Sequence, residues 1–204
     1  ITYRRKNMGR KPNFTREEIL ECAFEILNSE SLKEVTARNI AKKLGVSTIA
    51  IYSAFKSMDE LKNELSKKAK TKLFEYTKRD YTDLSILNIG IGICLFAKEE
   101  KALFRTIFLR EGLPREFMDE VMDDFRNLIY SGFNKNREYN QFPVDIIEWV
   151  IKKGWYFSHG YATLICTGFY IDIEFETFKN EIIEMGNVLI EKALEMTKER
   201  DNEV

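Results

Sequence analysis

Apolar residues recur at helical spacing along most of the chain, whereas alternating, strand-like stretches are scarce. The first helical segment opens with Thr15–Glu18, which has the form of a capping box, and it ends around Asn28–Ser31. Thr36 precedes a second, short segment that Gly45 ends, and Ser47 precedes a third. Another capping box, Ser57–Glu60, predicts a long fourth helix that runs to about residue 80.

Beyond that point the same spacing predicts five more helices, near residues 82–97, 99–110, 114–132, 144–167 and 175–199. Pro114 and Pro143 suit the starts of two of them, because a proline in the first helical turn loses no hydrogen bond. The chain of 204 residues has 3 prolines and 10 glycines, and 44% of its residues are hydrophobic, enough to fill a core. We therefore expect an all-α protein of about nine helices.

The net charge of −1 conceals an uneven distribution of charge. Residues 1–56 contain 11 Lys and Arg against 6 Asp and Glu, which leaves about +5 there and about −6 in the remainder. A basic N-terminal part joined to an acidic remainder favours a polyanionic partner for the first part alone.

The segment Ile40–Tyr52 has the pattern of a helix-turn-helix. Ala41 is small where the next helix would cross closely, and Gly45 permits the positive φ of a tight turn. The apolar wedge between the two helices would consist of Ile40, Leu44, Val46 and Ile51. The pattern predicts two short helices, the second of which can enter a DNA major groove, and the alternative is an ordinary helical hairpin with a glycine in its turn.

From Thr36 to Leu61 the chain resembles the DNA-binding domain of TetR-type regulators. The residues that match that family's pattern are Thr36, Ile40-Ala41, Gly45-Val46-Ser47, Ile51-Tyr52, Phe55, Ser57 and Leu61, and Ile19–Phe24 is similar to its first helix. The chain departs from the pattern at Ala54 and Met58, where the family commonly has side chains that hold phosphate, and Lys56 lies close enough to substitute.

The resemblance implies three parts and a function. Residues 1–14 would be a flexible basic arm, residues 15–60 a helix-turn-helix domain that includes the first turn of the fourth helix, and residues 61–204 a helical ligand-binding and dimerisation domain. The protein would be a dimeric cytoplasmic repressor that a small, largely apolar effector releases from a palindromic double-stranded DNA operator. No cofactor or metal is expected.

Phosphate contacts position a protein on DNA, whereas contacts to base edges select the sequence. Base contacts are expected from the exposed turn of the third helix and from the second helix, at Arg38, Thr48, Ile49 and Ala50, although Arg38 could instead hold phosphate. Ile49 and Ala50 cannot form side-chain hydrogen bonds, so their contact with a base would be apolar, as with a thymine methyl group. The resemblance implies phosphate contacts at Thr36, Ser47, Tyr52 and Lys56. Arg10 and Lys11 would enter a minor groove or remain a solvated tail.

Aromatic residues are frequent in the acidic remainder of the chain, and Trp155–Leu164 resembles a Trp-x-x-x-His-Gly stretch of some TetR-type regulators. In that family the effector pocket lies among the fourth to eighth helices, where the candidates are Phe96, Phe104, Phe108, Phe125, Trp149, Trp155, Tyr156 and His159. Packing in the core is the alternative for each of them. His159 lacks partners for a metal or catalytic site, so we expect an interior or interface histidine.

The last long helix carries an apolar stripe, which consists of Ile182, Met185, Gly186, Leu189, Ala193 and Met196. The resemblance implies that such a stripe contributes to a homodimer interface. Two recognition helices about 34–36 Å apart would then contact a palindrome.

Other functions fit the sequence less well. An activator or a ligand-independent repressor of the same fold stays open. A helical enzyme with a basic accessory domain would need a nucleophile and base, a phosphate loop or metal-ligand spacing, and the sequence offers none of these. The glycines of Asn88–Gly92 favour close helix packing rather than a phosphate loop. A structural adaptor leaves the helix-turn-helix unexplained. The three cysteines, Cys22, Cys94 and Cys166, are far apart and odd in number, so we expect buried free thiols rather than a disulfide framework or a metal site. No apolar run reaches the roughly 18 residues of a membrane span.

Overall fold

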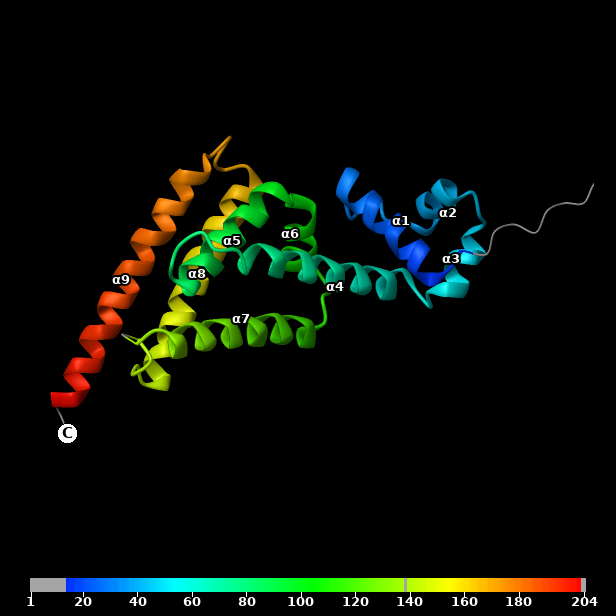
Figure 1. The fold of residues 1–204 in the computed structure, drawn as a ribbon. Coiled ribbons are helices and arrows are strands. Elements are labelled where there is room, and N and C mark those ends of the chain that lie inside the picture. Colours follow the sequence, from blue (N-terminus) through cyan, green and yellow to red (C-terminus); the bar gives the residue numbers. More distant parts are fainter. Residues whose placement is uncertain (1–13, 138, 203–204) are drawn as a thin grey trace, which may run out of the picture. The chain divides into compact units, whose positions relative to one another are not determined.

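The computed structural model describes residues 14–137 and 139–202, which contain nine helices and no strand (Figure 1). The all-α prediction is therefore confirmed. The chain divides into two compact units, one up to Ser66 and one from Lys67 onward. The predicted arm up to residue 13, which contains Arg10 and Lys11, lies outside the described residues.

The first unit is built from α1 (Arg16–Ser29), α2 (Ala37–Leu44), α3 (Thr48–Ala54) and the start of α4 (Met58–Thr77). Both predicted N-terminal caps form: Thr15 and Glu18 make a reciprocal capping box, and the Thr36 hydroxyl accepts from the Asn39 backbone N–H. One core joins these helices through the buried side chains of Ile19, Ala23, Leu27, Ile40, Ile51, Phe55 and Leu61.

The turn between α2 and α3 follows the prediction at one residue and departs from it at another. Gly45 has a φ of 68°, in the left-handed region, and its N–H bonds back to carbonyls of α2. Ser47 occupies the N-cap position of α3, but its side chain makes no capping hydrogen bond. Of the predicted wedge, Ile40 and Ile51 are fully buried, whereas Leu44 and Val46 are only partly buried.

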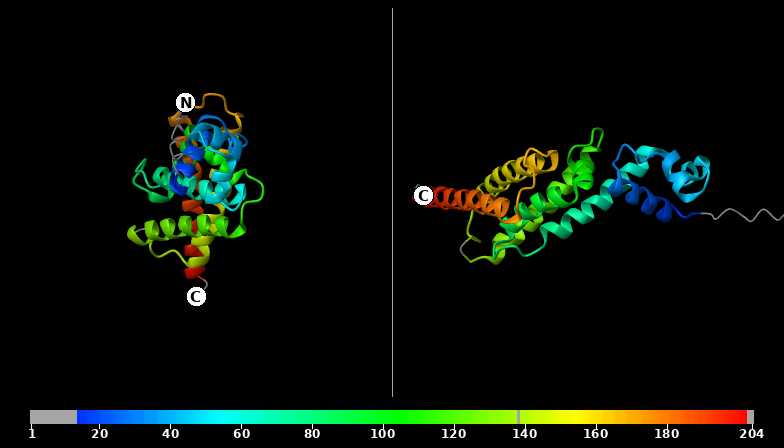
Figure 2. Two further views of the ribbon diagram at one scale, coloured as in Figure 1. Left: turned by 90° about the vertical axis from the view of Figure 1, so that its right-hand side faces the viewer. Right: turned by 90° about the horizontal axis from the view of Figure 1, so that it is seen from above.

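The second unit contains the end of α4 together with α5 (Ser85–Glu99), α6 (Lys101–Phe108), α7 (Arg115–Lys135), α8 (Val144–Thr167) and α9 (Phe175–Asn202). These are the five predicted helices, with ends shifted by a few residues. Every residue of α5 from Leu87 to Ala97 is buried, because α6, α7, α8 and α9 all pack against it. Figure 2 shows α8 and α9 side by side.

Two glycines of α5 allow close helix packing, as the sequence predicted. A Cβ at Gly92 would lie 2.7 Å from the Cα of Thr77 and from the carbonyl oxygen of Tyr76 in α4. A Cβ at Gly90 would meet Ser158 of α8 and Ile182 of α9. Nearby, the Asn88 side chain accepts hydrogen bonds from the backbone N–H groups of Tyr81 and Thr82 and so fixes the loop that enters α5.

The three cysteines are buried and free, as predicted. Among the described residues, no helix combines the length and the apolar character that crossing a membrane requires.

We expect Gly92→Ala to destabilise the protein by about 1–3 kcal/mol, because the added methyl group would overlap backbone atoms that cannot rotate away. Urea unfolding of the purified variant measures this. Gly154→Ala in α8 is the matched control, since its Cβ would lie 3.8 Å from Leu189, an ordinary contact. That control should be neutral or up to about 1 kcal/mol more stable through helix propensity. Equal unfolding midpoints for Gly92→Ala and the unaltered protein would contradict the close packing of α4 and α5.

Candidate functional site

The short helix α3 presents one face to solvent and buries the other. Ile51 and the C-cap residue Phe55 are buried at 0% and 1% exposure, whereas Ile49 is 78% and Tyr52 52% exposed. Thr48 and Ser53 are exposed on the same outward side. This division matches a recognition helix, whose inner face holds it on the domain while its outer face meets DNA.

The other predicted DNA-contacting residues lie close to α3 in the sequence and are mostly accessible. Arg38 on α2, Ser47 before α3 and Lys56 after it are exposed, whereas Thr36 and Ala50 are half-buried. The Thr36 hydroxyl accepts from the Asn39 backbone N–H at 3.1 Å, and this bond leaves its own proton available to donate to a phosphate oxygen.

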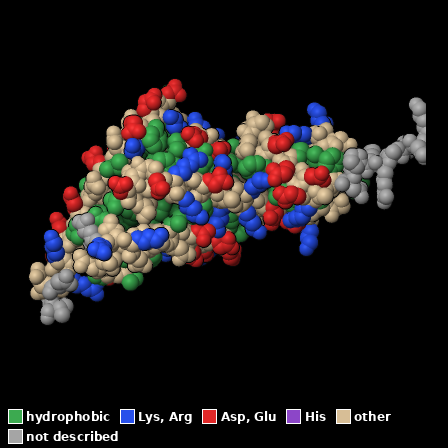
Figure 3. Space-filling view, in the orientation of Figure 1, with side chains coloured by type: hydrophobic (Ala, Val, Ile, Leu, Met, Phe, Trp, Pro, Cys, Tyr) green, Lys and Arg blue, Asp and Glu red, His purple; other side chains and the backbone are tan. Residues whose placement is uncertain are grey.

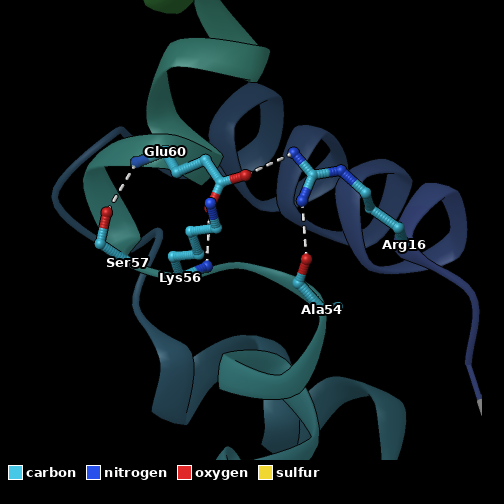
Figure 4. A network of polar contacts seen from close by, with 5 residues as sticks. All are labelled: Arg16, Ala54, Lys56, Ser57 and Glu60. Atoms are coloured by element: carbon cyan, nitrogen blue, oxygen red, sulfur yellow. Dashed lines mark hydrogen bonds and ion pairs between the residues drawn. The ribbon is translucent and has the colours of Figure 1, made fainter.

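A polar network joins the end of α3 to α1 and to the start of α4 (Figure 4). The Arg16 guanidinium donates to the Ala54 carbonyl at 2.6 Å and to the Glu60 carboxylate at 3.0 Å, and it lies 3.9 Å above the Phe55 ring. Glu60 also accepts from the Lys56 backbone N–H at 2.6 Å, and its own N–H donates to Ser57 Oγ at 3.0 Å. These bonds hold the chain as it leaves α3.

Only part of this network was predictable from the sequence. The pair Ser57 and Glu60 was predicted as a capping box, but the Glu60 carboxylate bonds Lys56 rather than the cap residue. Arg16 was missed, because a first-turn arginine on α1 carries no local signal of a partner 38 or 44 residues away. The hydrogen bond from the Lys56 N–H, and to a smaller extent the Arg16 side chain, lowers the pKa of Glu60.

The net positive charge of residues 1–56 does not come from the residues that the structure describes. Residues 14–56 contain six Lys and Arg and six Asp and Glu, whereas residues 1–13 contain five Lys and Arg and no acid. On the face drawn in Figure 3, acidic and basic side chains are interspersed. The sequence segment before α1 therefore holds the net charge that would attract a polyanion.

Six of the eight predicted pocket residues form one connected group of rings in the second unit, which we call the aromatic cluster: Phe96, Phe104, Phe108, Phe125, Trp155 and His159. The His159 ring stacks on Trp155 with centroids 4.8 Å apart and meets the edge of Phe108 at 4.9 Å. Trp149 and Tyr156 have no ring contact to this group among the described residues, and Tyr156 is 60% exposed. Phe96, Phe104 and Phe125 are fully buried.

His159 is held in an apolar setting. Burial lowers the pKa of its imidazole, so the ring is neutral at neutral pH. Its Nδ1 atom is buried and has no hydrogen-bond partner among the described residues. A buried nitrogen without a partner is unfavourable, and a bound molecule with a complementary group would relieve that cost.

Two cavities of different character lie in the second unit. A cavity of about 50 Å³ between α5, α7 and α8 is lined by apolar side chains with Phe125, Trp155 and Ser158, and no charged residue reaches it. A larger cavity of about 380 Å³ lies between the α4–α5 loop and the end of α7, and its lining mixes charged and polar side chains with apolar ones. None of the predicted pocket residues lines the larger cavity.

The apolar stripe predicted on α9 packs largely within the protomer. Ile182 and Ala193 are buried, and a Cβ at Gly186 would overlap the side chain of Leu87 in α5. Met185, Leu189 and Met196 are half-buried. The large apolar side chains that α8, α9 and their loop expose are instead Val144, Tyr156 and Leu164 on α8, Val188 on α9, and Phe169 and Ile171 in the loop.

We expect Glu60→Gln to lower the thermal stability of the protein near neutral pH, because the amide accepts less strongly from Lys56 and loses the ion pair with Arg16. A carboxyl group with a lowered pKa stabilises the fold above its ordinary value of 4.5 and loses that effect as pH falls through its folded pKa. The difference in melting temperature between the variant and the unaltered protein should therefore shrink in buffers below about pH 4.

Asp59→Asn is the matched control, since it removes a neighbouring exposed charge from the same helical turn. A deficit in Glu60→Gln that equals the Asp59→Asn deficit at every pH would contradict the network.

Comparison with known proteins agrees with this geometry. Residues 19–65 match the family described as bacterial regulatory proteins, tetR family. No curated protein is similar enough to the chain to count as a match. A tetR-family transcriptional regulator from Streptomyces coelicolor is similar in structure, with a TM-score of 0.68, 17% identity, and coverage of 94% of this chain and 86% of that one.

Two further solved structures share the fold. A transcriptional regulator of the TerR/AcrR family from Aquifex aeolicus has a TM-score of 0.56 at 18% identity, covering 86% of this chain and 99% of that one. PfmR, a TetR family regulator from Thermus thermophilus, has a TM-score of 0.53 at 18% identity, covering 83% and 94%. Residues 19–65 of the chain therefore match the tetR family of bacterial regulatory proteins, and the helices beyond that match share the fold of these solved structures.

Proposed function

We propose that the protein is a dimeric, cytoplasmic, sequence-specific repressor that leaves a palindromic operator when a small, largely apolar effector binds. The observation that carries this proposal is α3, a seven-residue helix held by a buried inner face while its outer face stays exposed within a match to the tetR family. Such a helix serves no evident packing purpose on its outer side, and DNA is the partner that fits it.

The exposed residues around α3 divide into two proposed roles. Arg38, Thr48, Ile49 and Ala50 contact bases. Ser47, Tyr52, Lys56 and the free proton of Thr36 contact phosphates, aided by Arg10 and Lys11. The exposure of Arg38 and Lys56, on α2 and just after α3, supports both assignments.

Dimerisation follows from the size of the site, because one seven-residue helix reaches too few base pairs to define an operator. We place the interface on the exposed apolar residues of α8, α9 and their loop, rather than on the α9 stripe that α5 partly covers. Tyr156, Val188 and Phe169 supply this surface, with exposures of 60%, 52% and 70%. Exposed apolar side chains on α8 and α9, two helices that pack against each other, favour a partner protein surface.

The aromatic cluster and the apolar cavity beside it support an effector without net charge. Phe125 and Trp155 belong to both, and neutral His159 provides one unpaired nitrogen. The cavity of about 50 Å³ is close to the volume of one or two water molecules. An effector must therefore displace side chains, and by binding one conformation better than another it shifts the population away from the DNA-bound form.

An activator, or a repressor that needs no effector, has the same DNA-binding geometry. Reporter output from the operator, measured with and without the protein, separates activation from repression. The primary experiment is selection of bound DNA from a random pool, and failure to enrich a palindrome counts against the dimeric repressor.

On the selected DNA, Arg38→Ala should weaken binding by about 1–3 kcal/mol and relax the choice of sequence, because it removes a base contact. Lys56→Ala should weaken binding to every sequence alike and reduce the slope of log affinity against log salt by about 1. Fluorescence anisotropy over a salt series measures both. An equal loss on selected and random DNA for Arg38→Ala would exclude it from base recognition.

Tyr156→Arg should raise the dimer dissociation constant by at least about tenfold, because it would bury an unpaired charge in the interface. Sedimentation over a range of protein concentrations measures this change. Leu109→Arg is the control, since Leu109 is an exposed apolar residue beyond the end of α6. Equal behaviour of the two variants would move the interface away from α8.

A further inference from the structure

We propose that the recognition helix α3 selects its operator through thymine methyl groups, which it contacts with the side chain of Ile49. This inference rests on the proposed DNA-binding function and specifies the chemistry of the partner. It starts from the composition of Ser47–Phe55, a segment without any charged, amide or imidazole side chain.

That composition excludes the usual hydrogen-bonded contacts to bases from α3. Guanine is recognised by bidentate Arg or Lys, adenine by Asn or Gln, and cytosine by a carboxylate, and none of these side chains is present in the segment. Of the three hydroxyl groups within α3, that of Ser53 donates to the Ala50 carbonyl at 2.7 Å. Only the hydroxyls of Thr48 and Tyr52 remain to donate a hydrogen bond.

Ile49 is the large aliphatic side chain that α3 offers to a partner. It is 78% exposed, whereas Ile51 two positions later is fully buried and belongs to the core. Ile49 therefore contributes little to folding, and its apolar surface becomes buried only against something outside the protomer. On the floor of a major groove, the one base feature that suits an aliphatic side chain is the 5-methyl group of thymine.

Thr48 and Ala50, the residues on either side of Ile49, each carry a methyl group, and Thr48 is exposed whereas Ala50 is half-buried. Arg38 on α2 is exposed and is the arginine nearest to α3 in the sequence, and arginine can bind guanine bidentately. The operator half-site should therefore combine thymines opposite α3 with a guanine opposite α2.

The test uses the DNA that the full chain selects from a random pool. Each thymine is replaced in turn by deoxyuridine, which removes the methyl group and leaves the hydrogen-bonding edge unchanged. At the positions that Ile49 contacts, affinity should fall about fourfold for each methyl group removed. Placing 5-methylcytosine, rather than cytosine, at the same positions should recover part of the affinity.

Two variants make the assignment specific. Ile49→Ala should bind thymine and deoxyuridine DNA with nearly equal affinity, and circular dichroism should show an intact fold because Ile49 is exposed. Lys56→Ala should weaken binding to both DNAs by the same factor and so preserve their ratio.

The outcomes separate the inference from the function beneath it. Failure to enrich any DNA sequence overturns the proposed function and the inference with it. Selective DNA binding without any deoxyuridine effect overturns the inference alone. A deoxyuridine effect that persists undiminished in Ile49→Ala also overturns it, because the methyl groups would then act through DNA shape.

Discussion

The burial of Ile51 and Phe55 is the contact on which the candidate DNA-binding surface depends. Seven residues are too few for a stable isolated helix, so α3 exists only because its inner face is packed. Arg16 adds to this packing by covering the Phe55 ring and by bonding the carbonyl at the end of α3. The side chains of the outer face are consequently not needed for folding, so binding to a partner can determine which residues occupy it.

Affinity and selectivity have different origins in this arrangement. The described residues from 14 to 56 are balanced in charge, and the excess of positive charge lies in residues 1–13. Non-specific attraction to phosphate grows with the number of cations, whereas the outer face of α3 has none. A surface made of Ile49 and a few hydroxyl groups adds little attraction to arbitrary DNA, and the contribution of Ile49 depends on the bases it meets.

The fold was predictable from the sequence where local chemistry decides it. Thr15, Thr36 and Gly45 act within one helical turn, and the structure has their caps and their left-handed turn as predicted. Ser47 has the same kind of local signal but makes no side-chain cap, because sequence fixes its position and not its rotamer. Arg16 could not be found in this way, since its partners are brought to it by the tertiary fold.

Which face of a long helix is buried was also harder to predict, because it depends on the tertiary fold. Apolar periodicity identified the α9 stripe, but only the tertiary structure shows that Leu87 already occupies the space beside Gly186. The aromatic residues illustrate both results. Phe104, Phe108, Trp155 and His159 come together as one cluster, whereas Tyr156 follows Trp155 directly and points to solvent, because adjacent positions on a helix face different directions.

The effector control that we propose requires a modest difference in binding free energy between two conformations. Moving a two-state equilibrium from 1:99 to 99:1 requires about 5.5 kcal/mol of preference for one state. At about 25 cal/mol per Å² of apolar surface, this corresponds to roughly 220 Å² more burial in that state. The cavity of about 50 Å³ cannot bury so much surface, so the proposed effector control requires a ligand-bound state in which rings such as Phe125 and Trp155 are displaced. Because these rings contact each other and His159, moving one of them disturbs the others, and a ligand bound at this point acts on α5, α7 and α8 together.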